Sequence, residues 1–338
     1  MTSTFQLEVL DLRHFSARQL RPLLEQESRL WSERLRWDYR SSADLLLQYL
    51  DARVLPGFVA LDRGRVCGYI FCVHEGSKAV IGDVFAVADA SSQPTVDVEN
   101  TLLTHLLEML QNSPNVSRIE AQLLLHGEGL HKRPFLQNGF RIYPRLFMEC
   151  EVGAGAADAS GGDGAAARDQ ADALVQTAPG VELRKWSPED FTAAGELIQQ
   201  CYLGHLDSRI NNQYRSVAGS LRFLHNIVRF PGCGVFDAET SLVLHDASSG
   251  GLIGLLLCSR VRQDVAHITQ ICVAQNYRRR KLGKLLVQEC LGLLKERGFS
   301  ALTLTVTAAN RDAVALYESF GFKVAHRFDA MVWDPEEA

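Results

Sequence analysis

The sequence lacks any apolar run long enough to span a membrane, although 46% of its 338 residues are hydrophobic. Its first residues, MTSTFQLEVLDLRHF, also lack the cationic end and the long apolar stretch of a signal peptide. We therefore expect no membrane partner and a cytoplasmic location. A chain of this length can form two domains of ordinary size, each with its own hydrophobic core.

An excess of positive charge is also missing, because the formal net charge is -5. Nucleic-acid binding needs an extended basic face, so we expect no nucleic-acid partner. The basic residues gather in one short stretch, 278–284. A local cluster of this size suits a small anionic ligand.

The eight cysteines lack the spacing of metal ligands and lie mostly within apolar runs, so we expect reduced core residues and no metal. Only Cys272 lies near the basic stretch. No basic residue close to it in sequence would lower the pKa of its thiol, so a nucleophilic role is not favoured. The eight are Cys67, Cys72, Cys150, Cys201, Cys233, Cys258, Cys272 and Cys290.

One segment present in the chain joins a buried strand to an amphipathic helix through a basic turn. Residues 267–273 (HITQICV) form a mostly apolar run with β-branched residues, and residues 278–281 are all cations. Gly283 then opens a helical pattern that continues to Leu294. Unpaired N–H groups at a helix start and nearby cations attract phosphate oxygens, which indicates an anion site, whereas a solvated charged turn is the plain alternative.

A second strand and helix follow at the right distance. Residues 301–306 (ALTLTV) predict a buried strand, and Asn310 can cap a helix that ends at Gly321. The stretch from about Ile268 to Val332 resembles the GNAT superfamily of acetyl-CoA-dependent N-acyltransferases. Its signature Asn-x-x-Ala-x-x-Leu-Tyr-x-x-x-Gly-Phe falls on Asn310, Ala313, Leu316, Tyr317, Gly321 and Phe322.

The resemblance implies a pyrophosphate loop at the basic turn, in which Lys281 stands where the family usually has its first glycine. It also implies that strand N–H groups hold the pantetheine arm of acetyl-CoA, the expected cosubstrate. The cofactor-binding residues implied in this way are Ile271, Cys272, Val273, Arg278, Arg279, Arg280, Lys281, Leu282, Gly283, Lys284, Asn310 and Tyr317.

The resemblance makes Tyr317 the general acid that protonates the departing thiolate, against the alternative of a plain core aromatic. No base is evident, because the strand offers Thr269 and Gln270 where many relatives carry Glu. His267 is a weak base candidate. His205, Asp207 and a chain of water molecules are further alternatives.

The segment 202–215 (YLGHLDSRINNQYR) is dense in polar and aromatic groups, and a helix is predicted over 211–227. Loops at this place line the acceptor pocket in the resembled family. The acceptor-side candidates are therefore His205, Asp207, Asn211 and Tyr214, although Asn211 could simply begin a helix. A small-molecule amine is favoured, and a peptide N-terminus or a protein lysine stays open.

The order of elements before residue 152 is similar to the order after residue 181, which suggests a tandem duplication. We expect an α/β (α+β) protein with two GNAT-like domains, 1–152 and 181–338. Each should be a mixed, mostly antiparallel sheet flanked by helices, with a splayed central parallel pair, which is 267–273 with 301–306 in the second domain. Residues 153–180 are rich in Gly and Ala and predict a flexible linker.

The first half lacks glycine and cations in the turn at 88–97, so we interpret it as a degenerate copy that does not bind coenzyme A in the usual way. The chain is expected to be a monomer with pseudo-dimeric domains or a weak homodimer. A nicotinamide-binding Rossmann fold is not favoured, because Gly283 stands alone and late. A non-catalytic acyl-CoA-binding protein is the remaining rival.

Overall fold

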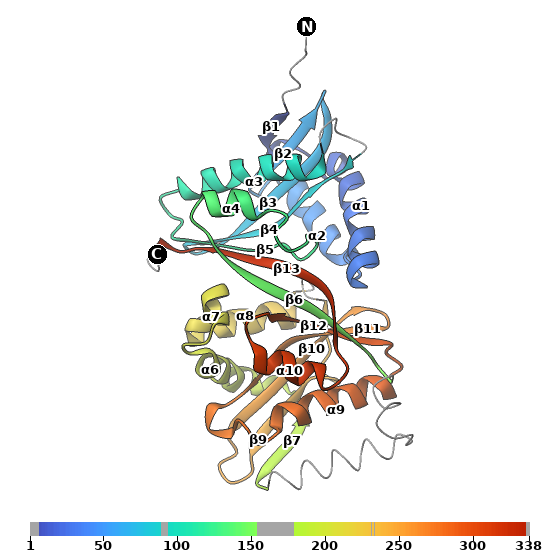
Figure 1. Ribbon diagram of the computed structural model, residues 1–338, viewed down its shortest axis with the longest axis vertical. Coiled ribbons are helices and arrows are strands. Elements are labelled where there is room, and N and C mark those ends of the chain that lie inside the picture. The colour runs from blue at the N-terminus through green and yellow to red at the C-terminus, as the bar shows by residue number, and fades with distance from the viewer. Residues whose placement is uncertain (1–6, 89–93, 154–178, 231, 233, 336–338) are drawn as a thin grey trace. The chain divides into compact units, whose positions relative to one another are not determined.

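The computed structural model describes residues 7–88, 94–153, 179–230, 232 and 234–335. These residues form two compact units, each with helices against a mixed sheet (Figure 1). Unit 1 falls within Met1–Arg145 and His326–Ala338, and unit 2 falls within Leu146–Ala325. Among the helices in the described ranges, none has the length and apolar character needed to cross a bilayer.

Unit 1 follows the element order that its apolar periodicity predicts. Ser16 and Gln19 form a capping box at the start of its first helix, and Gly64, at a φ of +76°, turns one hairpin. Its strands are β1 (Glu8–Asp11), β2 (Gly57–Asp62), β3 (Arg65–Glu75), β4 (Lys78–Ala86) and β5 (Arg118–Gln122). Its helices are α1 (Ala17–Leu35), α2 (Arg40–Asp51), α3 (Thr95–Gln111) and α4 (Lys132–Gln137).

Unit 2 repeats this order. Its strands are β7 (Val181–Lys185), β8 (Val235–Phe236), β9 (Leu242–Asp246), β10 (Leu252–Arg262), β11 (Val265–Val273) and β12 (Ala301–Thr307). Its helices are α6 (Phe191–Tyr202), α7 (Asp207–Ile210), α8 (Val217–Arg229), α9 (Leu282–Glu296) and α10 (Arg311–Glu318). The prediction of one continuous helix over 211–227 is wrong, because the structure divides this segment into two elements. A 3₁₀ turn spans Asn212–Arg215, and α8 begins only after Ser216, whose hydroxyl accepts from the Gly219 N–H.

Two long strands contribute to both units. The end of β6 (Arg141–Glu151) lies in unit 2, where Leu146, Met148 and Cys150 join the core. The end of β13 (Lys323–Trp333) belongs to unit 1 and pairs with β5. The compact units therefore exchange strands, whereas the predicted boundaries at 152 and 181 cut the chain in sequence. Those boundaries stay a prediction, and most of the predicted linker lies outside the described residues.

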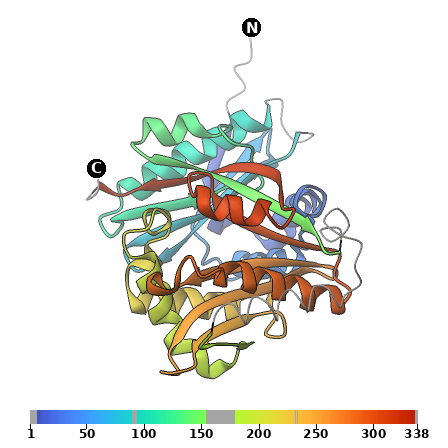
Figure 2. The same ribbon diagram turned by 60° about the horizontal axis from the view of Figure 1, so that its bottom comes forward.

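The sheets are mixed and mostly antiparallel, as expected. In unit 1 the strand order is β1-β2-β3-β4-β5-β13, and in unit 2 it is β6-β12-β11-β10-β9-β7. One parallel pair lies inside each, β4 with β5 and β11 with β12, which confirms the predicted central pair. In unit 2, alternate residues of β10 pack into two separate cores, one built on α9 and the other on α6, so helices cover both faces of its sheet (Figure 2).

Candidate active site

The parallel pair of unit 2 separates after four residue pairs, from Val265 opposite Ala301 to Ile268 opposite Leu304. Beyond Ile268, β11 continues to Val273 paired with β10, and no second strand pairs with it among the described residues. Alternate N–H groups of a strand point to opposite sides, and the Ala274 N–H donates to Ile253 O on the β10 side at 2.8 Å. The N–H groups of Ile271 and Val273 therefore face the side that β12 has left.

This alternation divides the residues that the sequence assigned to the pantetheine strand. Ile271 and Val273 present backbone N–H groups to the open side, whereas Cys272 stands opposite Leu255 with its N–H toward β10. A hydrogen bond with Cys201 and burial raise the pKa of the Cys272 thiol. Cys272 is therefore a protonated thiol rather than a nucleophile.

The basic turn that follows has an unusual backbone. Arg279 and Lys281 have φ angles of +63° and +60°, values that glycine adopts without strain. Lys281 occupies the N-cap of α9 in this left-handed conformation. That geometry explains why the resembled loop usually has glycine at this position. The first N–H groups of α9 have no partner within the helix, and the side chains of Arg279, Arg280 and Lys281 beside them are exposed.

The other cations of the turn are placed differently. Arg278 donates from Nε to Val273 O at 3.2 Å and from Nη2 to Cys201 O at 3.1 Å, so it ties the end of β11 to α6. The guanidinium of Arg280 lies 4.9 Å from the centre of the Tyr277 ring. Arg278 thus fixes the turn, while Arg280 remains exposed at its outer edge.

Helix α10 carries the second motif. Asn310 caps it, since its side chain accepts from the Ala313 N–H at 3.3 Å, as the sequence predicts. Tyr317 lies on the same helix, seven residues after Asn310, and is only 5% exposed. Burial and the negative charge of Asp207 raise the pKa of the Tyr317 phenol. The hydroxyl is therefore fully protonated at neutral pH and can donate a proton.

The loop after α6 is anchored to both separating strands. The Tyr202 hydroxyl lies 3.5 Å from Gln270 Oε1 and 3.5 Å from Ile271 O on β11. On the other side, the Thr307 hydroxyl at the end of β12 donates to Asp207 Oδ1. The loop thus spans the opening between β11 and β12, and it brings the Asp207 carboxylate close enough to influence Tyr317.

The remaining acceptor-side candidates surround this anchor. Tyr214 stacks on Tyr202 with ring centres 4.3 Å apart, and His205 Nδ1 lies 3.7 Å from Asp207 Oδ2. Asn211 caps a turn, because its Oδ1 accepts from the Gln213 N–H at 3.0 Å. That is the capping alternative that the sequence left open.

Two residues are placed otherwise than the sequence reasoning suggested. His267 lies in the paired part of β11, with Nδ1 2.9 Å from Thr303 Oγ1 and its ring stacked on Phe147, so the structure does not bring it to the open end. Gln270, dismissed as a base, is 5% exposed, and its Nε2 has no hydrogen-bond partner among the described residues. A buried N–H donor left in this way is a candidate contact for a bound ligand.

Comparisons with known proteins identify the family of this part of the chain. Residues 207–322 match the model of the acetyltransferase (GNAT) family. The ribosomal protein bS18 alanine N-acetyltransferase of Escherichia coli is 36% identical over 78 residues, which are 23% of this chain and 53% of that protein. The corresponding enzyme of Salmonella typhimurium is 40% identical over 67 residues, 20% of this chain and 45% of that protein. The chain thus spans about half the length of these curated relatives.

Solved structures match over nearly the whole chain. A GCN5-related N-acetyltransferase from Sphaerobacter thermophilus has a TM-score of 0.61 at 15% identity, covering 99% of this chain and 96% of that one. A tandem GNAT protein from the clavulanic acid biosynthesis pathway has a TM-score of 0.58 at 14% identity, covering 97% and 98%. At such identities the likeness concerns the fold. Together, these findings show a GNAT-family acetyltransferase domain over residues 207–322 and, for the chain as a whole, the fold of GNAT proteins.

Proposed function

We propose that unit 2 is an N-acetyltransferase that moves an acetyl group from acetyl-CoA to a primary amine of a small molecule, by direct attack in a ternary complex. The observation that carries the proposal is Tyr317. Its hydroxyl is buried, protonated and close to Asp207, beside two strands that separate. A non-catalytic acyl-CoA-binding protein would have no need of a proton donor at this place.

The donor side of the proposal rests on backbone N–H groups. The start of α9 and its exposed cations would hold the pyrophosphate, and the outward N–H groups of Ile271 and Val273 would hold the pantetheine arm and the thioester oxygen. Donors fixed by a strand and a helix need no rearrangement when negative charge develops on that oxygen.

The acceptor side rests on the loop that spans the opening. A neutral amine nitrogen would attack the thioester carbon, the C–S bond would break, and the thiolate would take the Tyr317 proton. The amine would give up a proton to Asp207 or to water. Asp207 is preferred to His267, because its carboxylate lies near Tyr317 while His267 lies within the paired sheet.

The test measures release of coenzyme A thiol from acetyl-CoA with a panel of small amines, polyamines and peptides with a free N-terminal alanine. We expect turnover in the wild type. Tyr317→Phe should lower kcat by about 10²- to 10⁴-fold with little change in KM for acetyl-CoA, because the phenol acts in the transition state. Tyr49→Phe, at an exposed position of α2, is the matched control and should change neither parameter.

Two outcomes would change the proposal. Binding of acetyl-CoA without turnover of any amine would favour the non-catalytic alternative. Turnover confined to the alanine peptides would move the acceptor to a peptide N-terminus; the curated relatives are named for an alanine of ribosomal protein bS18. An unchanged kcat in Tyr317→Phe would exclude Tyr317 as the acid.

A further inference from the structure

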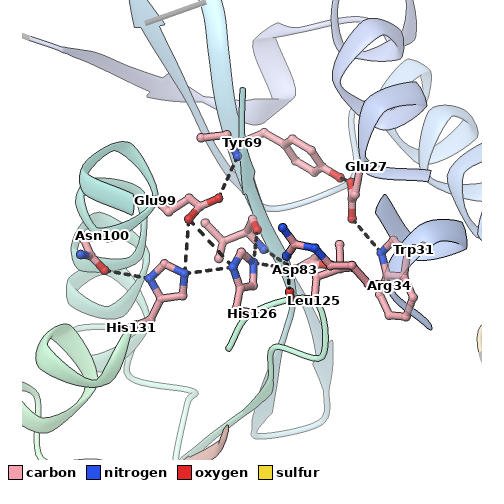
Figure 3. Close-up of polar contacts among 12 residues, drawn as sticks. Glu27, Trp31, Arg34, Tyr69, Asp83, Glu99, Asn100, Leu125, His126 and His131 are labelled. Atoms are coloured by element: carbon pink, nitrogen blue, oxygen red, sulfur yellow. Dashed lines mark hydrogen bonds and ion pairs between the residues drawn. The ribbon is translucent and has the colours of Figure 1, made fainter. Parts of the chain in front are cut away.

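Three side chains of unit 1, which we name the His₂Glu cluster, point their ligand atoms toward one another (Figure 3). Glu99 comes from α3, His126 from the loop after β5, and His131 from the residue that precedes α4. Their exposed fractions are 5%, 7% and 4%. Imidazole nitrogens and a carboxylate oxygen thus converge in the interior of unit 1.

The spacing of the three inner atoms matches a tetrahedral metal centre. His126 Nδ1 lies 3.1 Å from His131 Nε2, which lies 3.3 Å from Glu99 Oε2. The third separation, from His126 Nδ1 to Glu99 Oε2, is 3.9 Å. Bonds of about 2.0–2.1 Å to a tetrahedral Zn²⁺ place its ligand atoms about 3.3 Å apart. Small shifts of the side chains would therefore complete three ligand positions.

The outer atom of each ligand already has a partner. His126 Nε2 lies 2.8 Å from Val84 O, and His131 Nδ1 lies 2.9 Å from Asn100 Oδ1. Glu99 Oε1 accepts from the Ala86 N–H at 3.1 Å. Metal-binding histidines are oriented in this way, with the second ring nitrogen donating to an oxygen.

These outer contacts also decide what the inner atoms can do. A metal-bound imidazole is neutral and has one N–H, which in both histidines would be directed at the outer oxygen. The inner nitrogens would then present lone pairs to each other and to the Glu99 carboxylate. Three acceptors at these distances repel one another in a buried site unless a cation lies between them.

The charges around the cluster fit a divalent cation. Asp83 Oδ1 lies 3.7 Å from His126 Nε2, so it adds a second carboxylate beside Glu99. Burial, followed by the charge of Asp83, raises the pKa of the neighbouring Glu27, which also accepts a hydrogen bond from Tyr69. Two carboxyl groups, those of Glu99 and Asp83, thus lie where they can balance the charge of a divalent cation.

We propose that unit 1 binds one Zn²⁺ ion through Glu99 Oε2, His126 Nδ1 and His131 Nε2, with a water molecule as the fourth ligand. The ion would fasten α3 and the start of α4 to the loop after β5. Its role would be structural, since the ligands are buried and lie in the unit without the transfer residues. The site is independent of the proposed acetyl transfer.

The test begins with the tag-free, full-length chain. We expect about one zinc per chain by elemental analysis, removal by a strong chelator, and rebinding when Zn²⁺ is titrated against a fluorescent chelator. Co²⁺ should replace it and give the visible absorption of a tetrahedral site. At a free Zn²⁺ concentration about 100 times Kd, the midpoint temperature of thermal unfolding should rise by about 5 °C or more.

Variants locate the ion. Glu99→Gln and His131→Gln should each weaken Zn²⁺ binding by more than about 100-fold, and loss of the outer partner in Asn100→Ala should weaken it by about 10- to 100-fold. His105→Gln is the matched control, because His105 lies on the same helix but is exposed and bonded to Thr101 O. It should bind Zn²⁺ like the wild type.

The wild-type measurements test the zinc proposal even if a variant fails to fold. A wild type that takes up neither Zn²⁺ nor Co²⁺ at micromolar concentrations would overturn the proposal and leave a shared proton as the cation of the cluster. Equal zinc binding by wild type, Glu99→Gln and His131→Gln would overturn it as well.

Discussion

The two units share one backbone arrangement but differ in the groups that lie on the open side of the central strand. In each, a central strand pairs in parallel over four residues and then continues past the end of that pairing with only its antiparallel neighbour among the described strands: β4 beyond Ile81 in unit 1 and β11 beyond Ile268 in unit 2. In unit 1 the N–H groups on the open side belong to Val84 and Ala86. The corresponding groups in unit 2 belong to Ile271 and Val273.

In unit 1 the open side is occupied by the chain itself. The Val84 N–H donates to Asp83 Oδ1 at 2.8 Å, and the Ala86 N–H donates to Glu99 Oε1 at 3.1 Å. Carboxylates thus stand where, in unit 2, we propose that acetyl-CoA lies. A duplicated fold can therefore change its ligand through a few side chains, because donors already satisfied by the chain have little to gain from a ligand.

The largest expected effect concerns the number of acetyl-CoA sites. Calorimetric titration should give one site per chain, and Arg280→Ala should weaken it by about 1.5–3 kcal/mol, about 10- to 150-fold, through loss of a charge-assisted contact to phosphate. Arg133→Ala, an exposed arginine of α4 in unit 1, should leave the affinity unchanged. Two sites per chain would end the contrast between the units.

The buried carboxylate Glu27 gives unit 1 a pH dependence of its own. Its pKa is raised by burial, so the folded state keeps it neutral while the unfolded state ionises above its reference pKa of about 4.5. The wild type therefore loses stability as pH rises above that value, by about 1.4 kcal/mol per pH unit until the folded pKa is reached.

Glu27→Gln removes this dependence; its Oε1 can still accept from Trp31 Nε1, and its Nε2 can donate to the Tyr69 hydroxyl oxygen. We expect the variant to match the wild type near pH 4 and to exceed its free energy of unfolding by about 1.4 kcal/mol at pH 5.5. Urea unfolding at several pH values measures the difference. A constant difference between the two proteins over this range would contradict the assignment.

Gly283→Ala separates ligand binding from packing in unit 2. A Cβ at this position would lie 3.5 Å from Leu316 Cδ2, an ordinary contact, and alanine favours a helix over glycine by up to about 1 kcal/mol. Folding stability should therefore hold or rise slightly. Acetyl-CoA binding should weaken several-fold, because the added methyl group keeps phosphate away from the helix start. Unchanged affinity would show that phosphate does not approach this residue.

The smallest effect concerns the left-handed Lys281. Lys281→Gly should raise the free energy of unfolding by about 0.5–1 kcal/mol, because glycine adopts a positive φ without strain. Arg63→Gly, at a φ of +52° in the β2–β3 turn of unit 1, should give a similar gain and serves as the comparison. A loss of stability at Lys281 alone would indicate that its side chain holds the turn.

The sequence by itself determined the family of the domain in the second half, the order of elements and the parallel pair at the centre of each sheet. These features depend on local patterns, since apolar periodicity, the Asn310 cap and the Gly321 turn act within a few residues. The strand exchange by β6 and β13 could not be predicted in this way, because strand partners are chosen by contacts between residues far apart in the chain.

Only the tertiary structure decided which polar groups meet. Gln270 and Tyr202 come together from β11 and α6, and nothing in either segment alone predicts the contact. The pair His126 and His131 has the His-x₄-His spacing of many zinc sites, a signal that attention to cysteines missed. Their convergence with Glu99, 27 residues before His126, depends on α3 packing against β4, because burial and distance are properties of the folded chain.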